Sequence, residues 1–108
     1  MTEIFHVVPK PAWDRARLRG EYRGDTLDTE GFIHCCTAAQ VAGVLDRYFR
    51  GQTGLLLLKI ELPRLRPPVR WESPPHSLEA FPHVYGPVNL NAVVDITPLD
   101  PVEGGRDA

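Results

Sequence analysis

The spacing of hydrophobic residues in the first part of the chain predicts short elements separated by polar turns. Residues 4–8 form an apolar run that is typical of a short strand. Residues 12–19 predict a short helix with Trp13 and Ala16 turned inward. Residues 21–30 are polar and rich in turn-forming types, so we expect an irregular loop there.

The most regular pattern of the chain follows a second predicted strand at residues 31–36. Thr37 and Gln40 have the spacing of a capping box, which marks the start of a helix. Apolar residues then recur at intervals of three and four, which predicts one stripe along a helix over about residues 38–50. The stripe consists of Val41, Val44, Leu45, Tyr48 and Phe49.

The second half of the chain is mostly extended, with prolines in the loops and at strand ends. Residues 55–62 begin as a continuous apolar run, which predicts a central strand covered on both faces. Shorter strands are predicted at residues 69–72, 81–86 and 92–96. Because the helices come early and most strands come late, we predict an α+β fold with two short helices packed on a mainly antiparallel or mixed sheet.

Length and composition fit one ordinary globular domain. The chain has 108 residues, of which 43% are hydrophobic and 24% charged. We expect a single domain over residues 1–99 and a flexible tail over residues 100–108. A net charge of −2 lacks the basic excess that generic nucleic-acid binding requires. No apolar run approaches the roughly 20 residues that span a bilayer, and no signal peptide is recognisable, so we expect a cytoplasmic protein without membrane contact.

Three of the four histidines lie within apolar, strand-like segments, namely His6, His34 and His83. An apolar core gains nothing from three groups that must each find hydrogen-bond partners, whereas a cleft can use them near neutral pH. We therefore predict that the three histidines line one concave site with Tyr85 at its wall. For each position alone, a structural histidine bonded to the backbone remains the alternative. His76 lies in a proline-rich loop and is expected to be solvated.

Metal and thiol chemistry are the alternatives at these positions. Three histidines and a water make a catalytic zinc set, but no HxH or HExxH spacing is present, so we expect no metal. Cys36 and His83 could form a nucleophile pair, although no local motif supports one. Cys35 and Cys36 are adjacent and are expected to be free thiols.

Charged residues add candidates that carry no motif. The acidic candidates are Glu30, Glu72 and Glu79, each of which could equally be a surface charge. The first predicted helix and the turn after it are locally basic, with Lys10, Arg15, Arg17, Arg19 and Arg23. The ordinary interpretation of such a cluster is a solvated face, and the sharper one is a phosphate contact.

Three segments, at residues 4–7, 30–41 and 81–87, resemble a bacterial family, domain of unknown function 952. The resemblance covers the chain from Ile4 to about Leu99. That family is similar in fold to ADP-ribosyltransferases, and more distantly to RNA 2′-phosphotransferases. The resemblance implies a split, strongly bent sheet with NAD⁺ in its cleft.

The resemblance also implies residue roles. His6 would hold the ribose on the adenosine side, and His34 would hold the ribose that carries nicotinamide. Cys36 lies where relatives usually have serine, and Tyr85 would cover the nicotinamide. His83 replaces the usual glutamate and would be the acid–base group.

The implied activity is ADP-ribosyl transfer or hydrolysis of the nicotinamide bond, with a nucleotide as the small-molecule partner. Two alternatives stay open. The first is a module that binds a nucleotide or small phosphorylated ligand without turnover. The second is a metal-dependent enzyme that uses the three histidines.

Overall fold

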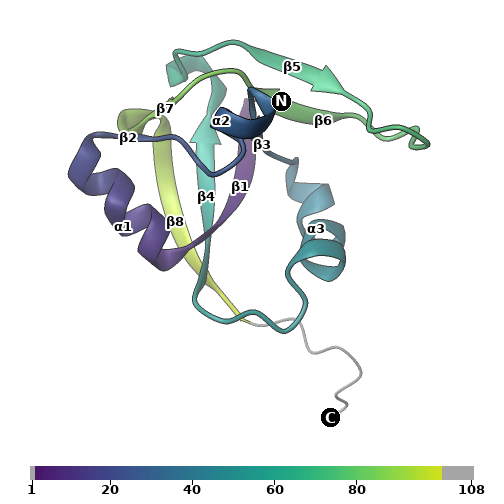
Figure 1. The fold of residues 1–108 in the computed structure, drawn as a ribbon, viewed down its shortest axis with the longest axis horizontal. Coiled ribbons are helices and arrows are strands. Elements are labelled where there is room, and N and C mark those ends of the chain that lie inside the picture. The colour runs from purple at the N-terminus through teal and green to yellow at the C-terminus, as the bar shows by residue number, and fades with distance from the viewer. Residues whose placement is uncertain (1, 101–108) are drawn as a thin grey trace.

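A computed structural model describes residues 2–100, and Figure 1 shows their arrangement. The predicted tail therefore lies outside the described residues, apart from Asp100. The strands and helices follow in the order β1 (Glu3–Pro9), α1 (Lys10–Arg19), β2 (Glu21–Tyr22), α2 (Leu27–Glu30), β3 (Ile33–His34), α3 (Val41–Tyr48), β4 (Leu55–Glu61), β5 (Val69–Glu72), β6 (Phe81–Val84), β7 (Val88–Asn89) and β8 (Val93–Leu99). Short 3₁₀ turns occupy Ala38–Gln40, Leu62–Arg64 and Leu90–Ala92.

The strands form antiparallel sheets that meet at a single bridge. One sheet has the order β1-β4-β8, a second has the order β3-β6-β5, and β2 pairs with β7. The backbones of Phe5 and Cys36 exchange hydrogen bonds of 2.7 and 2.8 Å, which join β1 to the segment after β3. The predicted α+β fold with mainly antiparallel sheets and few short helices is confirmed.

Helix α1 packs as its sequence predicts. Trp13 and Ala16 are buried, and the Trp13 ring lies 6.5 Å from the ring of Tyr22 in β2. Gly20 ends the helix with a φ of 90°, a left-handed conformation that favours glycine because other residues carry a Cβ. Figure 1 shows α1 and α3 on opposite sides of β1 and β4.

The capping box is present at the start of the second predicted helix. The Gln40 side chain accepts a 2.9 Å hydrogen bond from the backbone of Thr37, and the Thr37 side chain caps the Gln40 backbone in return. The helix itself is shorter than predicted, since a 3₁₀ turn precedes α3 and α3 ends at Tyr48. None of its residues is fully buried, and Tyr48 is 64% exposed.

The core lies against one face of β4, which is the central strand as predicted. Leu56, Leu58 and Ile60 are buried, whereas Leu57 and Lys59 between them are only partly covered. Within the continuous run, full coverage is confirmed at Leu55 and Leu56 but not at Leu57, and beyond Leu58 burial alternates along the strand. No helix in the described part of the chain is long and apolar enough to cross a membrane.

The segment predicted as an irregular loop at residues 21–30 contains β2 and α2 instead. Strand β2 depends on a partner distant in sequence, since it pairs with β7, whereas α2 is held locally by a 2.7 Å hydrogen bond from the Thr26 hydroxyl to the carbonyl of Phe32. The strand predicted at residues 31–36 is likewise reduced to Ile33–His34. Such two-residue and four-residue elements leave no hydrophobic period in the sequence.

Candidate functional site

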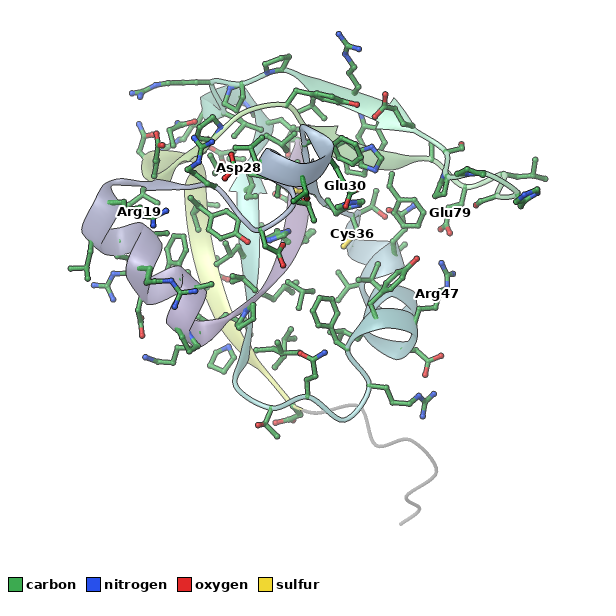
Figure 2. All side chains as sticks on the ribbon, in the orientation of Figure 1. Arg19, Asp28, Glu30, Cys36, Arg47 and Glu79 are labelled. Atoms are coloured by element: carbon green, nitrogen blue, oxygen red, sulfur yellow. The ribbon has the colours of Figure 1, made fainter. Side chains whose placement is uncertain are left out.

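A broad cleft of about 1280 Å³ is lined by residues of helices α1 and α3 and of strands β1, β2, β3, β5 and β6. All five residues singled out from the sequence line it, namely His6, His34, Cys36, His83 and Tyr85. Figure 2 shows Glu30 and Cys36 between α2 and α3. The geometry thus brings the predicted residues together, although they differ in what their side chains are free to do.

His83 belongs to a hydrogen-bonded cluster on β5 and β6. Its Nδ1 lies 2.7 Å from Oε1 of Glu72, and the Tyr85 hydroxyl donates a 2.6 Å hydrogen bond to the same oxygen. Strand β5 pairs antiparallel with β6, which places Glu72 and His83 on the same face of the sheet. A single carboxylate therefore fixes both the imidazole and the phenol.

The hydrogen bond to Glu72 leaves the other ring nitrogen of His83 available. Because Nδ1–H donates to the carboxylate, Nε2 of the neutral ring is an acceptor. Within residues 2–100, every buried polar side-chain atom has a hydrogen-bond partner. Nε2 of His83 has none, so it is not fully buried. Nε2 therefore reaches the surface of the cleft, although only 9% of the side chain is exposed.

The protonation states of the cluster follow from its hydrogen bonds. The bonds from Tyr85 and His83 lower the pKa of Glu72, so its carboxylate stays ionised. The same bond to Glu72 raises the pKa of Tyr85, which keeps its hydroxyl protonated and donating. Phe32 stacks on the His83 ring at 4.1 Å between centroids and covers its face. These contacts hold the imidazole in one orientation.

A second histidine–carboxylate pair lies beside the first. Nε2 of His34 lies 3.1 Å from Oε1 of Glu30, four residues earlier in the chain at the end of α2. His34 is directly opposite His83 in the β3–β6 register, and the two rings are 5.2 Å apart. The His34 side chain is half exposed, so it can contact a ligand directly.

His6 differs because both of its ring nitrogens are engaged within the protein. Its Nδ1–H donates to the carbonyl of His34 at 2.6 Å, and its Nε2 accepts from the Tyr22 hydroxyl at 2.6 Å. Burial lowers the pKa of His6 to about 4, so the ring is neutral near pH 7. Part of the residue keeps some surface exposure, but the nitrogens themselves are occupied. In this arrangement His6 fastens β1 to β2 and β3.

The two cysteines are free and buried. Cys36 lines the cleft, but burial raises the pKa of its thiol to about 11, and burial also raises the pKa of Cys35. A thiol that stays protonated is a poor nucleophile, which argues against the alternative of a Cys36–His83 pair. No group of side chains among the described residues is arranged to hold a metal ion.

We expect Cys35 and Cys36 to resist a thiol reagent such as 5,5′-dithiobis(2-nitrobenzoate) in the native protein at pH 8. A pKa near 11 leaves roughly 100-fold less thiolate than an ordinary cysteine has at that pH. Both thiols should react rapidly once the protein is unfolded in urea, which serves as the control. Rapid labelling of Cys36 in the native protein would show an accessible, activated thiol instead.

Glu72 is one of the acidic candidates named from the sequence, but its hydrogen bond to His83 was not predicted. Its sequence neighbourhood resembles that of any surface strand, because Arg70 and Trp71 beside it are exposed. Its role depends on which residues of β5 and β6 pair. Because an eight-residue loop at positions 73–80 connects the two strands, the sequence does not determine that pairing. A period-two pattern alone could show only that Glu72 and Arg70 share a face.

Comparison with known proteins gives the family and the fold. A sequence model described as "Protein of unknown function (DUF952)" matches residues 7–96. The crystal structure of protein CC0527 from Caulobacter crescentus is 30% identical and covers 92% of this chain and 87% of that chain, with a TM-score of 0.82. The solution NMR structure of CC0527 is 33% identical and covers 93% and 86%, with a TM-score of 0.78. No curated protein matches the sequence.

Proposed function

The chain belongs to the DUF952 family of proteins of unknown function, and we propose that its cleft binds a nucleotide and catalyses an acid–base step with His83. NAD⁺ is the ligand to test first, because the family resemblance implies a fold similar to that of ADP-ribosyltransferases. The observation that carries the proposal is the Glu72–His83–Tyr85 cluster, in which Nε2 of His83 reaches the cleft while Nδ1–H is fixed.

A general base requires two properties, and the cluster supports both. The base must lie within reach of the group that it deprotonates, and it must be unprotonated before the proton transfer. Glu72 selects the tautomer of His83 that leaves Nε2 unprotonated, as a carboxylate does in histidine-based catalytic sites. An imidazole held in this way needs little reorganisation during proton transfer.

In our proposal, Glu72 also takes the role of the glutamate that is usual in the transferases and that His83 replaces here. The segment that matches the usual glutamate strand offers His83, but the neighbouring strand β5 brings an ionised carboxylate within 2.7 Å of it. A fixed negative charge favours a transition state that develops positive charge on the ribose. In our proposal, Glu72 provides that charge from the next strand and His83 provides the base.

The proposed reaction breaks the glycosidic bond between C1′ of the ribose and the nicotinamide nitrogen. Nicotinamide leaves with the bonding electron pair and is neutral. A hydroxyl oxygen of the acceptor, or of water, bonds to C1′, and Nε2 of His83 takes its proton. With water the products are ADP-ribose and nicotinamide, and the proton is later released to solvent.

We expect the purified protein to bind NAD⁺ and to release nicotinamide from it slowly, because water can always serve as acceptor. Binding is measured by isothermal titration calorimetry and release by chromatography. Leu78→Ala is the matched control, because this side chain is fully exposed and lies outside the cleft. Saturable binding without release would favour the module that binds without turnover, and absence of NAD⁺ binding would remove the nucleotide proposal. A parallel titration with zinc tests the metal-dependent alternative.

A further inference from the structure

One face of α1 forms a wall of the cleft at some distance in sequence from the histidines. Besides Pro11, the residues of α1 that line the cleft are Ala12, Arg15, Ala16 and Arg19. They follow the spacing i, i+3, i+4 and i+7, which places them along one side of the helix. Figure 2 labels Arg19 near the end of α1 that leads into β2.

Arg15 and Arg19 form no ion pair within residues 2–100, unlike Lys10 and Arg23, whereas Arg17 on the same helix is unpaired as well. Lys10 pairs with Asp14 at 2.9 Å on the same helix, and the guanidinium of Arg23 pairs with Asp28 at 2.8 Å. Neither Arg15 nor Arg19 belongs to any of the ion pairs formed in that part of the chain. Two like charges four residues apart repel each other on a helix, and an anion between them would relieve that repulsion.

We infer that Arg15 and Arg19 form the anion-binding end of the cleft and take a phosphoryl or diphosphate group. Guanidinium groups suit this role because their planar N–H donors match phosphate oxygens. Arg23 also lines the cleft, but its bonds to Asp28 and to Glu21 already occupy it. The acidic side chains of Glu21 and Asp25 also line the cleft.

This inference deepens the proposed function, on which its nucleotide ligand rests, and gives the cleft two ends. One end holds the histidine–carboxylate pairs, and the other holds two unpaired arginines. The Tyr22 ring lies 5.0 Å from that of His6, which bonds to the His34 carbonyl, and 6.5 Å from that of Trp13 in α1, so His6 and Tyr22 connect the two ends. A ligand that fits carries a diphosphate apart from its reacting bond, as NAD⁺ does.

Inorganic pyrophosphate and ADP-ribose, titrated by calorimetry, test the anion site separately from catalysis. We expect Arg15→Gln and Arg19→Gln each to weaken both affinities about tenfold, because each removes a charge-assisted hydrogen bond. Arg17→Gln is the matched control, since Arg17 lies on the same helix but faces a separate shallow depression with Asp14 and Leu18. The affinity of Arg17→Gln should equal that of the wild type.

Thermal unfolding of the same variants separates binding from helix stability, because Arg17 and Arg19 both lie in the last turn of α1. A purely structural role of Arg19 would change the unfolding temperature and leave pyrophosphate affinity unaltered, which overturns the inference. Absence of pyrophosphate binding by the wild type at millimolar concentrations also overturns it. Arginine-dependent pyrophosphate binding without NAD⁺ binding would support the anion site while the nucleotide proposal fails.

Discussion

Replacement of His83 by glutamine is expected to lower the rate of nicotinamide release by roughly 10²–10⁴-fold, the usual contribution of general acid–base catalysis. Affinity for NAD⁺ should change only a few-fold, because proton transfer is an interaction of the transition state. Glutamine keeps the polar character of the buried site and can still bond to Glu72. Release by the variant is measured by chromatography at saturating NAD⁺, and affinity is measured by calorimetry.

Glu72→Gln tests the same cluster from its other member. The amide has nearly the shape of the carboxylate but lacks its charge, so His83 is no longer fixed in one tautomer. Because Glu72 orients His83 and its charge favours the transition state, kcat should fall while KM stays nearly constant, and Glu72→Asp should recover part of the loss. Trp71→Phe is the control, since Trp71 neighbours Glu72 in β5 but points to the opposite face. Unchanged turnover in both His83→Gln and Glu72→Gln would exclude His83 as the base.

The gathering of the histidines could be predicted from sequence because each one interrupts an apolar strand. A polar side chain between Phe5 and Val7, or after Ile33, has to find a partner or a cleft. That argument gives a location and says little about roles. It treats His6 and His83 alike, although both ring nitrogens of His6 form hydrogen bonds and only one ring nitrogen of His83 does.

The parts that sequence analysis missed depend on contacts between distant segments. Tyr22 lies in a stretch predicted as loop, but β7 pairs with it and directs its hydroxyl to His6. Glu72 acquires its role from a strand register that a long loop leaves undetermined. The capping box could be predicted, because Thr37 and Gln40 form their hydrogen bonds within four residues, whereas the helix after it is shorter than predicted. Hydrogen bonds between residues close in sequence can be predicted from a single sequence, whereas strand pairing between distant segments cannot.

The protein is expected to lose about 3 kcal/mol of stability between pH 6.5 and pH 4 through His6 alone. Its pKa is lowered from 6.5 in the unfolded chain to about 4 in the folded protein, and each unit corresponds to about 1.4 kcal/mol. Between these pH values the unfolded state binds more protons. The stabilisation is therefore complete above pH 6.5, and it is lost as the pH falls towards 4.

Urea unfolding at a series of pH values measures this loss, and two variants identify its source. His6→Asn removes the titrating ring, so the pH dependence between 6.5 and 4 should largely disappear, although the unpaired Tyr22 hydroxyl lowers stability at every pH. His76→Gln alters a loop histidine outside the cleft and should keep the full dependence. Glu72 loses its contribution at lower pH, since its folded pKa lies below the ordinary value of 4.5. A wild-type stability that stays constant from pH 6.5 to pH 4 would show that the folded protein does not hold His6 neutral over this range.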